Sequence, residues 1–471
     1  MASAKVEKKG TNGTTQAEFR NMMQTTRIRR LEFDNSISMK ELTSLVKQKL
    51  NISTDILLFG GTKPLSTMKE VHDHLKSTGK KARINVRRAV NLNDLKNLRR
   101  KMKIPELADF PYGVINVQAL RPVDVRERLV EQTVDFLQLC IADPAKAGFK
   151  IPSRSNFNVG YDDKTKMVLM GSQQVERVFR NLSSVQSVVQ MAGVMRIIDN
   201  ILKENAHVTK RELFYQDVNL FEDQRVSDAL IEDLGAMLQC TRTSLNVHAS
   251  AKGKVIGRLT FTEAGDVIDC QKGVGGHAIT PMINKIDNME SDAEFVLVIE
   301  KDAAFQRLAE DKFFDYVPSI IITASGQPDL ATRMFVKKIR EDLELPIMGL
   351  MDADPYGLDI LRVYTIGSKQ MSLETSELAV VDIKWLGLLP SDLDSYNISS
   401  NVRIPMTKTD TKRAEDLLDE DFVKARPEWK KEIEIMIDTK EKAEIQALAS
   451  KDLRYLTNVY LPEKLDKGDW V

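Results

Sequence analysis

The chain has 471 residues, of which 42% are hydrophobic, so it is long enough for two to four domains that each bury a core. Lys and Arg together number 68, as do Asp and Glu, so the overall charge neither indicates nor excludes a nucleic-acid partner. The sequence has no apolar run of the roughly 18 to 20 residues that a membrane span needs, no secretory signal and no zinc-type cysteine spacing, so we expect no membrane association, export or zinc site.

The first segments in chain order predict a small N-terminal unit. Residues 1–25 are polar and aperiodic, which predicts a disordered tail. A strand, a helix, a strand, a second helix and a strand are predicted over residues 26–90, and the segments include strand-like RIRRLEF, helix-like SMKELTSLVKQKL and strand-like DILLFGG and KKARINVRR. We expect a β-grasp unit here, because the FGGTKPL turn is also similar to the matching turn of ubiquitin-like domains. An interaction module and a structural extension are equally compatible with it.

Residues 91–124 contain RRKMK and three prolines, which predicts a linker. The basic cluster at residues 99–103 is short, so a targeting signal and a solvated linker both remain open.

Three helices are predicted next, at about 125–141, 185–202 and 226–238, from apolar side chains that repeat every three or four residues. They are followed by strand-like SLNVHA and by a predicted hairpin, KVIGRLTF and DVIDC around an EAGD turn. This order predicts a winged-helix (CAP-like) domain over residues 125–275. Winged helices bind DNA, but they also serve as protein-docking modules, so the fold alone favours DNA binding only modestly.

A candidate nucleophile lies inside that domain. Thr209 and Glu212 have capping-box spacing, which predicts that a helix begins here. Arg211 and Tyr215 would then share one helix face, so that a guanidinium could neutralise the phosphate that the phenol attacks. For a tyrosine in isolation, a role as a core anchor would be the simpler interpretation.

The glycine-rich segment KGVGGHAITP lacks the pattern of a phosphate-binding loop and predicts a linker, with a domain boundary near residues 275–292. From residue 290 to residue 471, buried strands alternate with helices: EFVLVIEK, AAFQRLAEDKFF, SIIITAS, LATRMFVKKIREDL, and then PIMGLMDAD and GLDILRVYTIG. This pattern predicts an α/β domain with a mainly parallel sheet covered on both faces.

Three carboxylates follow two of those strands. Glu300 comes after FVLVI, and Asp352 and Asp354 come after IMGLM. Ligands bind at the carboxyl ends of parallel strands, and oxygen donors without His or Cys suit Mg²⁺. A single acid would be interpreted as a helix cap, but the D-x-D-P-x-G pattern together with Glu300 favours a metal site.

Several motifs together resemble the A subunit of topoisomerase VI. They are TKRELFYQD, CTRTSLNV, GRLTF, VIEKDAAFQRLAED, GQPDLATR, DADPYGLDIL and KWLGL, and the resemblance covers about residues 125–471. The run from SDLDSY to VYLPEKL is most similar to the eukaryotic, plant-type members. The carboxylate motifs are similar to the metal site of Toprim domains, and the related meiotic double-strand-break transesterases share these motifs and the tyrosine.

The resemblance implies a type IIB DNA topoisomerase that makes and reseals double-strand breaks through a 5′-phosphotyrosyl link. It makes Tyr215 the nucleophile, Arg211 a contact of the same phosphate, and Glu300, Asp352 and Asp354 the ligands of Mg²⁺, with Glu300 alternatively shuttling protons. We expect Lys210, Arg242 and Arg333 to contact DNA.

The resemblance also implies double-stranded DNA as substrate and a homodimer in which the tyrosine of one protomer works with the metal site of the other. The chain has no ATP-binding pattern, so the ATP needed for strand passage would be bound by a partner, a B-type ATPase subunit in a heterotetramer. Location in the nucleus is expected from this function.

One departure from the family pattern is Ser325, which stands where the family usually has lysine. Arg333 or the pair Lys337 and Lys338 could replace the lost cation. Two alternatives to a topoisomerase remain: a meiotic break-forming transesterase that cleaves once and stays attached to DNA, and a DNA-binding scaffold without catalysis. A Toprim primase or nuclease is less favoured, because neither needs the Thr209 to Tyr215 arrangement.

Overall fold

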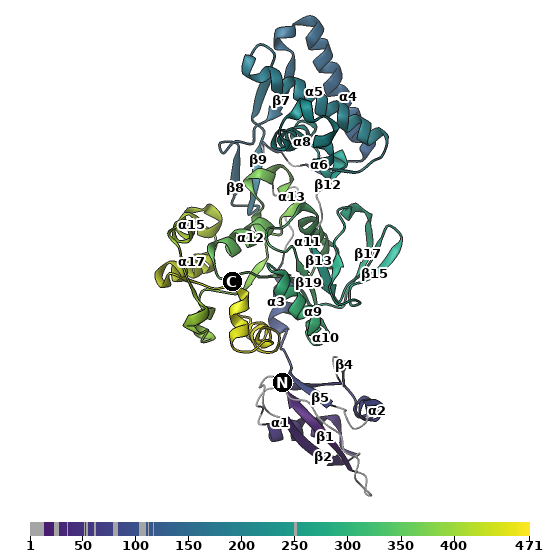
Figure 1. The fold of residues 1–471 in the computed structure, drawn as a ribbon, viewed down its shortest axis with the longest axis vertical. Helices are drawn as coiled ribbons and strands as arrows, with labels where there is room; N and C mark the ends of the chain where they lie inside the picture. The colour runs from purple at the N-terminus through teal and green to yellow at the C-terminus, as the bar shows by residue number, and fades with distance from the viewer. Residues whose placement is uncertain are drawn as a thin grey trace.

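The computed structural model describes residues 14–22, 28–34, 36–50, 52, 55–60, 63–78, 83–102, 110–111, 113–115, 117–248 and 252–471. Figure 1 shows a long molecule in three parts: an N-terminal unit (residues 14–88) at one end, a sheet lobe (residues 252–471) in the middle and a helical lobe (residues 122–248) at the other end. Among the helices of these residues, none is both long enough and apolar enough to span a membrane.

The N-terminal unit is a five-stranded sheet with two helices. Its elements are β1 (Thr14–Asn21), β2 (Ile28–Asp34), α1 (Met39–Leu50), β3 (Ile56–Gly60), β4 (Lys63–Pro64), α2 (Met68–Thr78) and β5 (Arg83–Arg88). The strand order is β2-β1-β5-β3-β4, in which the pair β1 and β5 is parallel and the other pairs are antiparallel. The strands and the helices predicted for residues 26–90 are therefore present.

The prediction of a disordered tail over residues 1–25 is wrong for residues 14–21, which form the strand β1 inside the sheet. Ala17 and Phe19 of this strand are fully buried in the core of the N-terminal unit. Two alternating apolar residues in a polar segment are too few to reveal a strand. Residues 1–13 and 23–27 lie outside the described residues.

The predicted linker is partly ordered and packed. It contains α3 (Asn93–Lys101) and β6 (Val114–Ile115). Leu95 of α3 is fully buried against the sheet lobe, and Lys96 forms an ion pair of 3.3 Å with Glu294. Arg99, from the basic cluster, donates to the carbonyl of Leu343 at 2.8 Å. This segment therefore attaches the N-terminal unit to the sheet lobe, because Leu95, Lys96 and Arg99 all contact that lobe.

The helical lobe surrounds a core of aliphatic and methionine side chains. Its elements are α4 (Pro122–Ala142), η3 (Pro144–Lys146), β7 (Gly148–Pro152), β10 (Gln174–Val178), α5 (Leu182–Lys203), β11 (Val208–Thr209), α6 (Lys210–Gln216), α7 (Val218–Phe221), α8 (Gln224–Leu238), η4 (Thr243–Leu245) and β12 (Val247–His248). The three predicted long helices correspond to α4, α5 and α8.

The predicted hairpin does not belong to the helical lobe. Strand β13 (Lys254–Gly257) pairs with β19 (Ser319–Thr323) in the central sheet, and β14 (Thr260–Glu263) pairs with both β15 (Asp266–Asp269) and β17 (Ile286–Glu290). The predicted boundary near residues 275–292 is therefore wrong, and the lobes divide between His248 and Lys254. A hairpin pattern does not indicate which sheet the hairpin joins, because strand pairing is set by tertiary packing.

The central sheet of the sheet lobe has the order β16-β13-β19-β18-β20-β21. Its further strands are β16 (His277–Ala278), β18 (Phe295–Ile299), β20 (Ile347–Leu350) and β21 (Lys384–Gly387). The four strands β19, β18, β20 and β21 are parallel, while β13 joins one edge antiparallel to β19 and β16 pairs antiparallel with β13. This confirms the predicted mainly parallel sheet.

Helices cover both faces of the central sheet. Val296 and Val298 of β18 face a core built with α11 (Leu330–Leu343) and α12 (Pro355–Ile366). The alternate residues Leu297 and Ile299 face α9 (Asp302–Glu310), α10 (Phe313–Tyr316) and α18 (Leu461–Lys467). Both sides of each strand are therefore buried, as expected for a parallel sheet.

The remaining elements extend the sheet lobe or join it to the helical lobe. They are β8 (Val159–Asp162), β9 (Met167–Gly171), η5 (Ile283–Lys285), η6 (Lys369–Glu374), α13 (Thr375–Leu378), α14 (Asp392–Ser395), η7 (Ser400–Val402), β22 (Ile404–Pro405), α15 (Lys408–Asp419), α16 (Asp421–Lys424), α17 (Pro427–Thr439), β23 (Glu441–Lys442), η8 (Ile445–Ser450) and η9 (Leu456–Tyr460). The small sheet β6-β9-β8 buries Val168 and Met170 against the sheet lobe, so it connects the two lobes.

Candidate active site

Helix α6 presents Tyr215 to solvent. The predicted capping box is present: Thr209 Oγ1 accepts from the backbone N–H of Glu212 at 3.1 Å, and Glu212 Oε2 accepts from that of Thr209 at 2.6 Å. Leu213 anchors the helix in the core of the lobe, while Tyr215 is 59% exposed. The tyrosine is therefore no core anchor, and a ligand can reach its hydroxyl.

Arg211 lies beside Tyr215, as the spacing of four residues predicts. Its Nη2 donates to the tyrosine hydroxyl at 3.4 Å, and its guanidinium carbon lies 5.7 Å from the ring centre. The hydrogen bond to Tyr215 raises the pKa of Arg211, so the guanidinium stays charged. The hydroxyl and the cation could therefore meet one phosphate together.

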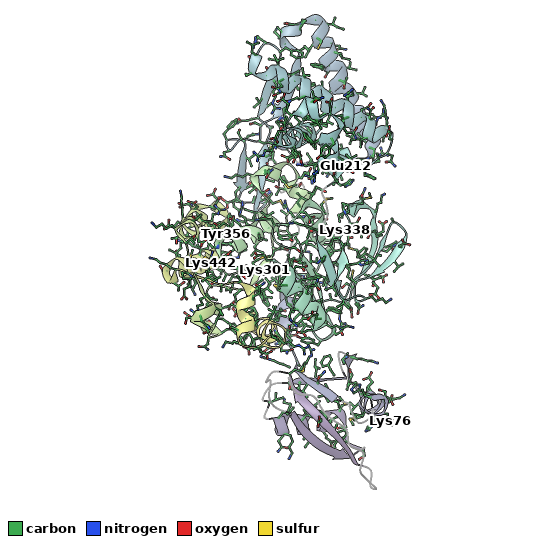
Figure 2. The ribbon with its side chains drawn as sticks, viewed as in Figure 1. Lys76, Glu212, Lys301, Lys338, Tyr356 and Lys442 are labelled. Carbon is green, nitrogen blue, oxygen red and sulfur yellow. The ribbon has the colours of Figure 1, made fainter. Side chains whose placement is uncertain are left out.

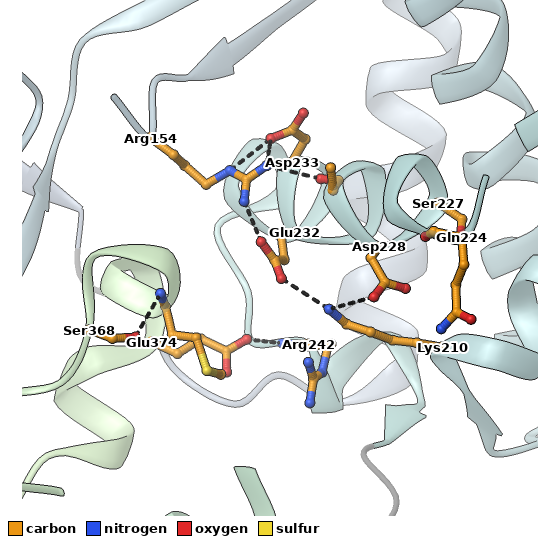
Figure 3. Close-up of polar contacts among 12 residues, drawn as sticks. Arg154, Lys210, Gln224, Ser227, Asp228, Glu232, Asp233, Arg242, Ser368 and Glu374 are labelled. Atoms are coloured by element: carbon orange, nitrogen blue, oxygen red, sulfur yellow. Dashed lines mark hydrogen bonds and ion pairs between the residues drawn. The ribbon is translucent and has the colours of Figure 1, made fainter. Parts of the chain in front are cut away.

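Lys210 faces the interior of the lobe instead of solvent. Its Nζ lies 3.0 Å from Glu232 Oε1 and 3.8 Å from Asp228 Oδ2, both on α8 (Figure 3). Glu232 also pairs with Arg154, which in turn binds Asp233. Lys210 thus ties the first turn of α6 to α8, and it has acidic partners that a DNA phosphate would have to replace.

The three predicted carboxylates meet at the carboxyl ends of β18 and β20. Glu300 Oε2 accepts from the backbone N–H of Asp352 at 2.8 Å, which links the two strands. Asp354 caps α12 by accepting from the N–H of Gly357 at 2.7 Å. A Cβ at Gly357 would lie 2.4 Å from the carbonyl oxygen of Asp352, so the turn requires glycine there. The D-x-D-P-x-G pattern therefore folds the two aspartates onto one strand end.

These carboxylates hold protons more tightly than usual. Burial raises the pKa of Glu300 to about 7, and the negative charge of Asp352 adds to this effect. Burial is also the first cause of the raised pKa values of Asp352 and Asp354. Buried acids that repel one another indicate a place where positive charge is needed, which is the environment that suits a divalent cation.

Lys301 and the backbone already satisfy part of this site. Lys301 Nζ lies 2.7 Å from Asp352 Oδ2 and 3.0 Å from Glu444 Oε2, and the N–H of Ile445 donates to Asp352 Oδ1 at 2.9 Å. In these side-chain positions, no group of three or more acidic, His or Cys residues in the described chain is placed to hold one metal ion. The oxygen donors suit Mg²⁺, but the side chains must turn to bind it.

Comparison with known proteins identifies the family. Residues 295–465 match the model of the Toprim domain of the topoisomerase 6 A subunit and Spo11, and residues 186–247 match that of type IIB DNA topoisomerase. The A subunit of DNA topoisomerase 6 from Arabidopsis thaliana is 50% identical over 73% of this chain and 81% of that protein. The A3 subunit from Oryza sativa subsp. indica is also 50% identical, over 69% of this chain and 73% of that protein.

The chain belongs to the family of topoisomerase 6 A subunits. The human meiotic recombination protein SPO11 is also similar, but its identity is lower, 37% over 73% of this chain and 87% of that protein. The chain is therefore part of a type IIB DNA topoisomerase, an enzyme that makes and reseals double-strand breaks in DNA. Membership implies DNA binding and a B subunit, and enzymes of this class generally depend on divalent metal.

The chain keeps its tyrosine apart from its carboxylates. Tyr215 lies on α6 in the helical lobe, whereas Glu300, Asp352 and Asp354 lie in the Toprim domain. Figure 2 shows this separation through Glu212 on α6 and through Lys301, Tyr356 and Lys442 beside the carboxylates. Within one chain, the structure does not bring Tyr215 to the three carboxylates.

The residues expected to contact DNA differ in their placement. Arg242 is partly buried, and its backbone N–H donates to the Glu374 carboxylate across the junction of the lobes. Arg333 is only 1% exposed, so the prediction that it contacts DNA is wrong for this conformation. Its side chain lies against Met371 and near Glu374, at the junction of the lobes.

The cations proposed to compensate for Ser325 are not free. Arg333 is buried, and Lys337 and Lys338 form ion pairs of 3.3 Å with Glu341 and 2.9 Å with Asp342. Lys301 and Glu444 also lie at the carboxylates, and the sequence motifs alone do not predict them there. Both lie in conspicuous motifs, VIEKDAAF and KAEIQAL, but only the fold places them together.

Proposed function

We propose that Tyr215 breaks DNA by transesterification. Its oxygen forms a bond to the phosphorus of a phosphodiester, the bond from phosphorus to the 3′ oxygen breaks, and a 5′-phosphotyrosyl link and a 3′-hydroxyl result. The phenol proton leaves to a base, and the 3′ oxygen takes up a proton. The exposed hydroxyl beside Arg211 is the observation that carries this proposal.

We assign Glu300, Asp352 and Asp354 to Mg²⁺, which when bound would stabilise negative charge on the phosphate. The raised pKa of Glu300, about 7, also suits transfer of a proton to or from the sugar hydroxyl. Arg211 would bind the same phosphate and hold its charge during the attack.

We further propose that Tyr215 of one protomer works with the carboxylates of a second in a homodimer, because the two sites lie in different lobes of one chain. A mixed dimer tests this arrangement. One protomer carries Tyr215→Phe and the other Asp352→Asn, and purification through two different tags isolates the mixed species. If the site is shared, one intact pair remains and nicks one strand, whereas an arrangement within one chain leaves no intact pair and no nick.

We also propose fold assignments for the helical lobe and for the N-terminal unit. The helices α5, α6 and α8 support a winged-helix domain that presents Tyr215 to DNA, with the wing no longer assigned to β14 and β15. The sheet order β2-β1-β5-β3-β4 with a parallel central pair supports a β-grasp unit at the N-terminus.

We propose that a B-type partner chain binds ATP and that the two kinds of chain form a heterotetramer in the nucleus. Helix α4 exposes the apolar side chains of Val130, Val134, Leu137 and Ile141, of which Ile141 is 86% exposed. An apolar row of this kind is typical of a surface that another protein chain covers, which supports a multi-subunit enzyme.

Relaxation of supercoiled plasmid tests the proposed chemistry. The chain is mixed with its candidate B subunit, Mg²⁺ and ATP, and Tyr215→Phe is compared with Tyr455→Phe, a partly buried tyrosine that packs against the core of the sheet lobe. We expect relaxation by the wild type and by Tyr455→Phe, and none by Tyr215→Phe. Relaxation by Tyr215→Phe would rule out this tyrosine as the nucleophile.

The meiotic break-former remains the second candidate, because SPO11 proteins are similar to this chain at lower identity. It would leave protein on 5′ ends without relaxing the plasmid, so 5′-linked protein without relaxation would favour it. A DNA-binding scaffold without catalysis would give neither result.

A further inference from the structure

Lys301 forms ion pairs with two carboxylates at the proposed metal site. Its ammonium group lies between Asp352, at 2.7 Å, and Glu444, at 3.0 Å. Asp352 has only 5% of its side chain exposed, whereas Glu444 has 52% exposed. One cation therefore bridges a buried acid of the proposed metal site and an acid at the solvent boundary.

The C-terminal segment holds Glu444 in this position. Ala353 and Ala443 exchange two backbone hydrogen bonds, of 2.8 and 3.2 Å, so the segment runs beside the D-x-D turn. Two residues after Ala443, Ile445 donates its N–H to Asp352. Glu444 is therefore fixed within reach of Lys301 by the same backbone that orients Asp352.

A divalent ion at Asp352 and the ammonium of Lys301 would compete for the same carboxylate oxygen. Two positive charges a few ångströms apart repel strongly where the surroundings are buried. Lys301 has a second acceptor in Glu444, toward solvent, so it can leave Asp352 without losing all of its pairing.

We propose that Lys301 is a resident counter-cation that a divalent metal displaces from Asp352, and that Glu444 holds Lys301 after the displacement. Lys301 and Glu444 are positioning residues, and the inference rests on the proposed metal role of Asp352. Glu444 thereby favours metal binding without being a ligand.

A double-mutant cycle on metal affinity tests this inference apart from catalysis. Mn²⁺ binding to the full chain is measured by the loss of the free-ion electron paramagnetic resonance signal. We expect Lys301→Met to tighten binding by about tenfold, because a competing cation is removed. We expect Glu444→Gln to weaken it by about fivefold, because Lys301 then stays on Asp352. In the Lys301→Met background, Glu444→Gln should change the affinity by less than about twofold.

Other outcomes overturn the inference. An equal effect of Glu444→Gln in both backgrounds would make Glu444 a direct ligand, and unchanged or weaker binding in Lys301→Met would show that Lys301 does not compete. Lys301→Arg keeps the charge and should bind Mn²⁺ within a few-fold of the wild type. Asp352→Asn checks the proposed metal site itself: if it binds Mn²⁺ as tightly as the wild type, that assignment fails, whatever the cycle gives. Thermal melting of each variant establishes that it is folded.

Discussion

The guanidinium carbon of Arg87 lies 4.0 Å from the ring centre of Tyr316, so a cation–π contact joins the N-terminal unit to the Toprim domain. Phe59 meets the same tyrosine edge-on, with ring centres 6.0 Å apart. Arg88 adds an ion pair to Asp466. The N-terminal unit therefore packs on the rest of the enzyme through side chains of β3 and β5.

Arg87→Ala should lower the free energy of unfolding by about 2 kcal/mol, because a desolvated cation–π contact is lost. Denaturant unfolding of the full chain measures this. Lys69→Ala, at an exposed position of the same unit, is the control and should leave the stability unchanged. If Arg87→Ala matched the wild type, the docking would not depend on this contact.

Arg333→Met should not weaken DNA binding, because Arg333 is buried. Burial lowers the pKa of Arg333 to about 10, so the folded state carries a cost for this charge, although the group remains charged at neutral pH. Its Nε and Nη2 have no hydrogen-bond partner among the described residues. Replacing such a group by an apolar side chain of similar size should leave the free energy of unfolding within about 1 kcal/mol of the wild type or raise it, which denaturant unfolding measures. A lower DNA affinity with a reduced salt dependence would instead restore Arg333 as a phosphate contact.

The sequence predicts most helices and the alternation of strands and helices over residues 290–471, because these signals are local. The capping box at Thr209 and the strand ends at Glu300 and Asp352 are examples: each depends on residues a few positions apart. The separation of Tyr215 from the carboxylates also agrees with the division into two domains.

What the sequence does not predict depends on contacts between distant segments. The strands β13 to β15 look like a wing, but β13 pairs with β19 of the Toprim domain and β14 pairs with β15 and β17 in the sheet lobe. Arg333 is a charged residue, but it is buried at the junction of the lobes. Lys301 and Glu444 meet only because the C-terminal segment pairs beside the D-x-D turn. The spacing of apolar residues along the sequence predicts which side chains are buried. It does not predict which distant side chains they contact.

Acidic pH should loosen the start of helix α6. His248 Nε2 and His207 Nδ1 lie 3.1 Å apart, and His248 pairs in register with Thr209, the cap of α6. Burial lowers the pKa of both histidines below their usual 6.5, and the nearby Lys285 adds to this. The unfolded chain therefore binds more protons, so the free energy of unfolding is at its full value above about pH 6.5 and falls as the pH drops below it.

Thermal unfolding between about pH 7.5 and pH 5 measures this dependence, and His248→Gln should flatten it. His277→Gln, at an exposed histidine of β16, should keep the wild-type slope. Equal slopes for His248→Gln and the wild type would assign the acid sensitivity to other groups.

Arg211 should affect the rate of DNA cleavage more than the affinity for DNA. Arg211→Ala removes the cation beside the Tyr215 hydroxyl, and the loss of one such group from a transition state lowers the rate by about 100- to 1,000-fold. Arg211→Lys keeps the charge but loses the planar fork that binds two phosphate oxygens, so it should recover only part of the rate. Single-turnover formation of the covalent complex on end-labelled duplex, at saturating DNA, measures the rate without the contribution of affinity. Arg196→Ala, at an exposed arginine on α5, is the control and should cleave at the wild-type rate. If Arg211→Ala cleaved normally at saturating DNA and bound only more weakly, Arg211 would attract the DNA backbone and take no part in the attack by Tyr215.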